Sequence, residues 1–99
     1  MTYARITGIG SYLPDKVLSN ADLEEMMDTS DEWIRERTGI KRRHIAAEDE
    51  TTASIALNAA QNAMEMAGIG PDELDLIVVG TCTPDKIIPA VACIVQRRL

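Results

Sequence analysis

The sequence has few aromatic residues: no phenylalanine, one tryptophan and two tyrosines. The interior must therefore be filled by Ala, Ile, Leu, Val and Met. A hydrophobic fraction of 45% supports a real core rather than a disordered chain. Ninety-nine residues suffice for one domain and no more.

No apolar run approaches the roughly 20 residues that a membrane-spanning helix needs. The N-terminus also lacks the basic start and apolar stretch of a signal peptide. Basic residues are few, because 10 Lys and Arg face 16 Asp and Glu and give a formal net charge of -6. This deficit argues against general nucleic-acid binding, which needs a broad basic surface. We therefore expect a soluble, cytoplasmic protein.

Several chemical signatures are missing as well. The sequence has no zinc ligand set, no glycine-rich phosphate loop and no Gly-x-Ser-x-Gly elbow, and Gly8 and Gly10 lack the rest of a dinucleotide fingerprint. Cys82 and Cys93 lack metal-ligand spacing, so we expect reduced thiols rather than a disulfide. No metal is expected.

Hydrophobic patterning predicts an α/β layered fold with at least partly parallel strand pairing. The apolar run at 76–80 has the character of a central strand covered on both faces. We expect strands at 3–12, 40–46 and 76–80, and helices at 21–27, 29–38, 51–67 and 90–99. Three strands make a thin sheet and the last helix has no closing residue, so we expect the chain to be incomplete at Leu99.

Helix boundaries have their own signals. Asn20 is the expected cap of the first helix, and Thr29 with Glu32 three residues later forms a capping-box pattern for the second. Thr51 or Thr52 caps the third. Gly39 and Gly68 end the second and third helices, and apolar residues on most sides of the third predict deep burial.

Half of the ten basic residues lie in one short stretch beside the only tryptophan. Trp33 and Arg37 are four residues apart and should share a helix face. An aromatic face with guanidinium groups suits a ligand that carries a base and phosphates. Alternatively, Trp33 anchors its helix to the core while Arg37 pairs with a surface carboxylate, and the basic run at 41–43 forms a solvated face. The basic residues are Arg35, Arg37, Lys41, Arg42 and Arg43.

Two cysteines and one histidine are the remaining candidates for chemistry. Cys82 follows the predicted central strand, where α/β active sites tend to lie, and Cys93 lies about one turn into the last helix. Both fit a small buried hydrophobe better than a nucleophile. His44 is the only imidazole, and nothing in the sequence brings it to either cysteine, so a structural role is favoured.

Five segments occur in the same order and spacing as in β-ketoacyl-acyl-carrier-protein synthase III, and the sequence resembles that family throughout. They are Gly8–Pro14, Asp28–Ile34, Arg37–Ile40, Arg43–Ala46 and Pro89–Cys93. The resemblance implies a thiolase-like fold, in which two related α/β halves are each built on a five-stranded mixed sheet, and a homodimer. Residues 1–99 would form the N-terminal portion of the first half, an incomplete domain.

The resemblance also implies a decarboxylating Claisen condensation that starts fatty acid synthesis. An acyl group moves from acyl-CoA to an active-site cysteine, and malonyl-acyl-carrier protein then loses carbon dioxide and its carbanion attacks the thioester. Acyl-CoA is a substrate, and no cofactor is implied. The family's catalytic Cys, His and Asn are expected beyond Leu99, so Cys82, Cys93 and His44 match none of them and the segment alone should be inactive.

Four residues match positions of the family's binding site. Trp33 matches the tryptophan that stacks on the adenine of CoA, Arg37 an arginine near the nucleotide phosphates, and Thr29 a threonine close to the adenine. Ile88 occupies a commonly aromatic position that lines the acyl pocket across the dimer interface. An isoleucine there makes a smaller and more flexible pocket wall than an aromatic residue, which is compatible with a longer or branched starter acyl group.

Two rival functions remain open at this point. One is a related condensing enzyme that primes polyketide or other secondary-metabolite synthesis. The other is a noncatalytic module that binds CoA or a carrier protein and is complete at 99 residues.

Overall fold

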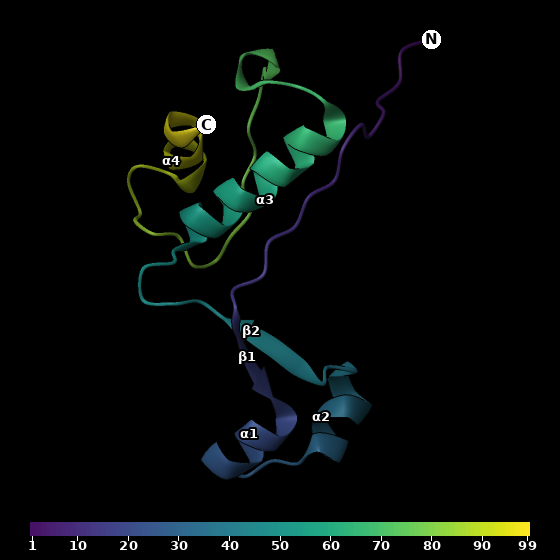
Figure 1. Cartoon of the computed structure of the whole chain (residues 1–99), viewed down its shortest axis with the longest axis vertical. Helices are drawn as coiled ribbons and strands as arrows, with labels where there is room; N and C mark the ends of the chain where they lie inside the picture. Colours follow the sequence, from purple (N-terminus) through teal and green to yellow (C-terminus); the bar gives the residue numbers. More distant parts are fainter. The chain divides into compact units, whose positions relative to one another are not determined.

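The computed structural model describes residues 1–99, which divide into two compact units. One unit comprises Leu13–Asp49, and the other comprises Met1–Tyr12 with Glu50–Leu99. Figure 1 shows the elements of both units. We refer to them as the 13–49 unit and the α3 unit.

The 13–49 unit is built on one short pair of strands. Strand β1 (Lys16–Ser19) pairs antiparallel with β2 (Arg42–Ile45). Helix α1 (Asn20–Met26) continues directly from β1, and α2 (Asp31–Thr38) precedes β2. The strand predicted at 40–46 is thus confirmed with narrower bounds.

Both helices of this unit are capped by the serine that precedes them, contrary to the predicted caps. The Ser19 hydroxyl accepts a hydrogen bond from the Asp22 amide, and the Asp22 carboxylate accepts from the Ser19 amide, which completes a capping box. The Ser30 hydroxyl caps α2 by accepting a hydrogen bond from the Trp33 amide. The predictions of Asn20 and Thr29 as caps are therefore wrong, because each neighbouring serine has the extended backbone of a cap and a hydroxyl within reach of the first helical turn.

In the α3 unit, α3 (Thr52–Ala67) is capped by Thr51 and ends at Gly68, whose φ of 69° is left-handed. A 3₁₀ turn, η1 (Pro71–Glu73), and helix α4 (Val91–Arg98) follow. The helix predicted at 51–67 is confirmed as α3, with its cap and its end. The predicted deep burial of α3 is wrong for most of its length. Only Ala53 and Leu57 of α3 are buried, where they pack against Val91 and Val95 of α4. None of the chain's helices has the length and apolar character needed to cross a membrane.

The strands predicted at 3–12 and 76–80 are absent, and with them the predicted parallel pairing. A strand requires a ladder of hydrogen bonds with a neighbour, and neither segment has one in these 99 residues. The 3–12 segment instead packs on α3, where the Ser11 carbonyl accepts from the Asn62 side chain at 2.9 Å. Figure 1 shows the N-terminal segment as an extended trace without an arrow.

Candidate functional site

The helix that carries the predicted site, α2, is fixed by local chemistry at both ends. The Ser30 hydroxyl accepts from the Trp33 amide at 3.1 Å, and Asp31 and Glu32 place negative charge at the first turn. Gly39 ends the helix with a left-handed φ of 72°, as its position predicted. Because Ser30 provides the cap, the side chain of Thr29 is not needed for it.

Trp33 and Arg37 form the expected pair on the surface of α2. The Cζ atom of Arg37 lies 4.8 Å from the centroid of the Trp33 ring, within the range of a cation–π contact. Trp33 is 53% exposed, so it does not anchor the helix to the core. Ile34 is the buried residue of α2. The alternative in which Trp33 is a core anchor is therefore wrong.

A surface hollow adjoins the tryptophan. It encloses about 490 Å³ and is lined by Met27, Asp28, Thr29, Ser30 and Trp33. The lining combines an aromatic ring and a thioether with two hydroxyl groups, which suits a flat ligand that has hydrogen-bonding edges. One carboxylate, that of Asp28, disfavours an anionic group directly inside the hollow, so phosphates would sit outside it.

The five clustered basic residues fall into two groups. Arg35 pairs with Asp31 at 2.7 Å, and Arg43 donates to the Leu18 carbonyl at 3.1 Å and to Asn20 Oδ1 at 2.8 Å. Both guanidinium groups are thereby engaged within the unit. Arg37, Lys41 and Arg42 are exposed. The cluster thus supplies fewer cations to a ligand than the sequence suggests, and Arg37 is the one that contacts Trp33.

Hydrogen bonds also tune the first carboxylate of α2. The pKa of Asp31 is lowered chiefly by the hydrogen bond from the Asn20 side chain, and next by that from Arg35. Asp31 therefore stays ionised at the start of the helix, where a negative charge is favourable.

The other candidates for chemistry are not brought together. Cys82 and Cys93 are free and exposed, which contradicts the expectation of small buried hydrophobes and confirms the absence of a disulfide. His44 lies in β2, and its Nδ1 contacts the Pro14 carbonyl at 2.5 Å, in keeping with a structural role. Ile88 is 84% exposed.

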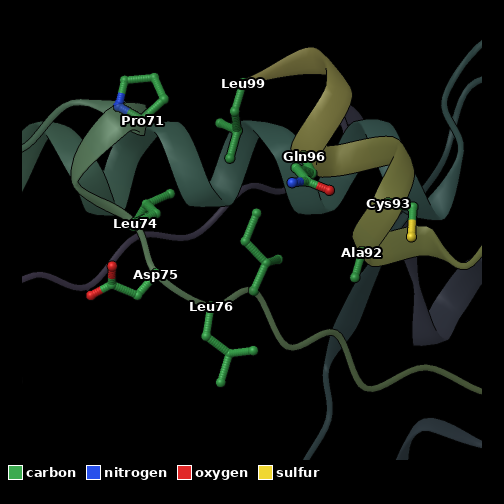
Figure 2. Close-up of a pocket in the computed structure, with 9 residues that line it drawn as sticks. Pro71, Leu74, Asp75, Leu76, Ala92, Cys93, Gln96 and Leu99 are labelled. Atoms are coloured by element: carbon green, nitrogen blue, oxygen red, sulfur yellow. The ribbon is translucent and has the colours of Figure 1, made fainter.

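A second cavity lies in the α3 unit, between the 71–77 segment and α4. It encloses about 330 Å³, and Figure 2 shows Ala92 and Gln96 of α4 on one side and Leu74 on the other. Asp75 and Cys93 are its only ionisable residues. No group of three or more metal-binding side chains occurs anywhere in the chain. This cavity therefore lacks the convergent polar groups of a candidate site.

Two polar residues make long-range hydrogen bonds that the sequence does not predict. Asn20 is 2% exposed and bonds residues 11, 20 and 23 positions away, and Asp85 bonds the amide of Ala53 across 32 positions. Neither spacing belongs to a helical or strand period. Such contacts arise only from the tertiary fold.

Known proteins resemble the chain over nearly all its residues, although no protein-family model matches it. The β-ketoacyl-[acyl-carrier-protein] synthase III of Thioalkalivibrio sulfidiphilus is 59% identical over 99 residues, which are 100% of this chain and 31% of that protein. The crystal structure of 3-oxoacyl-[acyl-carrier-protein] synthase III from Aquifex aeolicus matches with a TM-score of 0.88 and 54% identity, over 94% of this chain and 30% of the other.

A third similar protein is the priming β-ketosynthase of the R1128 polyketide pathway, with a TM-score of 0.88 and 38% identity over 95% of this chain and 28% of the other. These matches confirm the thiolase-like α/β fold class. The chain spans about a third of the length of the relatives it matches. Over its 99 residues, the chain is similar to members of the β-ketoacyl-acyl-carrier-protein synthase III family.

Proposed function

We propose that the protein carrying this chain condenses an acyl-CoA with malonyl-acyl-carrier protein and so initiates fatty acid synthesis. The acyl group leaves CoA as a thioester on an active-site cysteine. Malonyl-acyl-carrier protein then loses carbon dioxide, and the resulting carbanion attacks the thioester, forms a carbon–carbon bond and releases the cysteine thiolate. The identity of 59% to a synthase III over the whole chain supports this function.

The chain's own share of this function is recognition of the coenzyme. We propose that Trp33 stacks on the adenine of CoA, that Thr29 lies beside that base, and that Arg37 attracts the nucleotide phosphates. The observation that carries this assignment is the exposed Trp33–Arg37 pair at 4.8 Å beside the hollow that Thr29 lines. We assign no catalytic role to Cys82 or Cys93.

The intact protein is further proposed to act as a cytoplasmic homodimer with acyl-CoA and malonyl-acyl-carrier protein as its substrates and no cofactor. Gel filtration with light scattering tests the dimer. A protein that behaves as a monomer at assay concentrations and still condenses the two substrates would contradict it.

Coenzyme binding is tested by calorimetric titration of the protein that carries this sequence with CoA and with pantetheine, which lacks the nucleotide. Trp33→Ala and Arg37→Gln should each weaken CoA binding by about tenfold or more, because a stacked base and a charged hydrogen bond each contribute about 1–3 kcal/mol. Pantetheine binding should not change. Lys16→Gln removes a charge from β1 and serves as the control, with less than about a threefold effect.

Starter specificity is a further part of this proposal. We propose that Ile88 lines the acyl pocket across the dimer interface, where its branched aliphatic side chain leaves room for a longer or branched acyl group. Rates with acetyl-, branched and medium-chain acyl-CoA test this assignment. A strong preference for acetyl-CoA would contradict it.

A second candidate function has one specific observation in its favour. The priming β-ketosynthase of a polyketide pathway matches this chain with the same TM-score, 0.88, as the synthase III from Aquifex aeolicus, although its identity is lower, 38% against 54%. Product analysis separates the two enzymes. Saturable CoA binding without any release of carbon dioxide from malonyl-acyl-carrier protein would instead indicate a noncatalytic binding module.

A further inference from the structure

The most deeply buried polar side chain is an asparagine far in sequence from the residues it bonds. Asn20 is 2% exposed and is the first residue of α1. Its backbone amide donates to the Lys41 carbonyl at 3.0 Å, so the residue already bridges the ends of β1 and the segment before β2. Burying an amide side chain is unfavourable unless its polar atoms find partners.

The Asn20 side chain finds three partners, one at each end of α2 and one in β2. Its Nδ2 donates to Asp31 Oδ1 at 2.8 Å and to the Ile40 carbonyl at 2.8 Å. Asp31 is the first residue of α2, and Ile40 lies two residues after the last. The side-chain oxygen accepts from Arg43 Nη2 at 2.8 Å. One buried amide therefore ties the start of α2, its end and β2 together.

Apolar packing contributes little to the placement of α2, because Ile34 is its single buried residue. The other fixed point at its start is the Asp31 amide, which donates to Glu24 of α1 at 2.7 Å. Trp33 and Arg37, on this helix, are exposed. Hydrogen bonds at the two ends of α2 therefore fix the positions of Trp33 and Arg37.

We propose that Asn20 is a positioning residue for coenzyme binding: by holding both ends of α2, it places Trp33 and Arg37 for the nucleotide of CoA. This inference rests on the proposed function of those two residues. A satisfied buried amide would stabilise the fold wherever its partners were. Here its partners bracket the helix that carries the site, so its loss changes ligand affinity as well as stability.

The test uses an exchange of amide and carboxylate in the protein that carries this sequence. Asn20→Asp puts a carboxylate against that of Asp31 and removes both donors, so CoA binding should weaken by about tenfold. Asp31→Asn alone keeps an acceptor for Asn20 and should change affinity by less than about threefold. In the double variant an amide at 31 again donates to a carboxylate at 20, but the Ile40 carbonyl still lacks its donor, so affinity should recover in part, to a value between those of Asn20→Asp and the parent. Calorimetry with CoA gives the affinity, and circular dichroism gives the melting temperature.

Two results would overturn the proposal. One is Asn20→Asp binding CoA as the parent does, while Trp33→Ala weakens binding. The other is a double variant that recovers the melting temperature without recovering affinity.

If Asn20→Asp does not fold, Asp31→Ala is compared with Glu32→Ala, since both remove a first-turn carboxylate and only Asp31 bonds Asn20. Equal effects on CoA affinity contradict the proposal. Failure of the coenzyme site itself is recognised separately, because Trp33→Ala and Arg37→Gln would then have no effect.

Discussion

At the scale of single residues, two glycines allow the N-terminal segment to lie against the backbone of α3. A Cβ atom on Gly10 would stand 2.3 Å from the Ala59 carbonyl oxygen and 2.3 Å from the Ala63 nitrogen. Gly8 is similarly close to the Ala63 carbonyl. These neighbours are helix backbone, which cannot move aside by changing a rotamer. The close approach therefore depends on the absence of side chains at both positions.

Replacing Gly10 by Ala should destabilise the protein by about 2 kcal/mol or more, because an overpacked methyl group must push the segment away from α3. Gly80→Ala is the matched control, since its Cβ would meet nothing within 4 Å and its φ is not in the left-handed region. That change should stay within about 1 kcal/mol. Urea unfolding measures both. Equal losses of stability in the two variants would show that the contact with α3 does not contribute.

Residue contacts within one helical turn could be predicted from the sequence, and contacts across the fold could not. The pairing of Trp33 with Arg37 follows from the helical period, and Gly39 ends α2 because its left-handed backbone suits glycine. The role of Asn20 was predicted wrongly. An asparagine just before a helix pattern is compatible with a cap and also with a buried amide. Only the positions of α2 and β2 in the fold show that Asn20 is the buried amide.

At the scale of elements, the start of α3 is held by the loop that precedes α4. The Asp85 carboxylate accepts from the Ala53 amide at 2.8 Å, and the Thr52 hydroxyl donates to the Thr83 carbonyl at 2.5 Å. A hydrogen bond from Thr51 is the main cause of the lowered pKa of Asp85, followed by the Ala53 amide. The first turn of α3 has no acidic residue of its own, so Asp85 supplies a non-local carboxylate at the positive end of the helix.

This arrangement makes the stability of α3 sensitive to acid. Because the pKa of Asp85 is lower in the folded state, its contribution is complete above the ordinary aspartate value of about 3.9 and is lost as the pH falls through the lowered folded pKa. Asp85→Asn should therefore be less stable than the parent at pH 7, and the difference should narrow in acid. Urea unfolding at neutral and acidic pH measures this. Asp72 of η1 is exposed, and Asp72→Asn is the control. A stability difference between Asp85→Asn and the parent that does not change with pH would contradict the assignment.

Helices were easier to predict than strands for a physical reason. All bonds of a helix are local, so the cap at Thr51 and the stop at Gly68 define α3 within the sequence itself. A strand exists only with a neighbour, and the segments 3–12 and 76–80 have apolar and β-branched residues but no paired neighbour in this chain. The thiolase-like fold class was predicted from the order of motifs and not from periodicity.

At the scale of the whole molecule, each unit has a small apolar core. The α3 unit buries Ala53, Leu57, Val91 and Val95, and the 13–49 unit buries Ile34. Several large apolar side chains are more than half exposed in the two unpaired extended segments, namely Tyr3, Ile6, Ile9, Leu76 and Val78. Cores of this size leave little stability in reserve after the entropy of ordering the chain.

The 99-residue chain by itself should therefore self-associate or remain partly folded. Its unpaired segments present backbone hydrogen-bonding groups beside apolar side chains, which is the arrangement that promotes association between sheet edges. Light scattering after gel filtration should show species larger than a monomer, and a dye that binds exposed apolar surface should fluoresce. Val78→Lys should reduce association, because a charged side chain in an unpaired segment blocks pairing with a second copy. Ile87→Lys makes the same change in an exposed loop and should have a smaller effect. A monomer with one cooperative thermal transition at every concentration would refute the prediction and would mean that the two small cores suffice to hold the exposed segments in place.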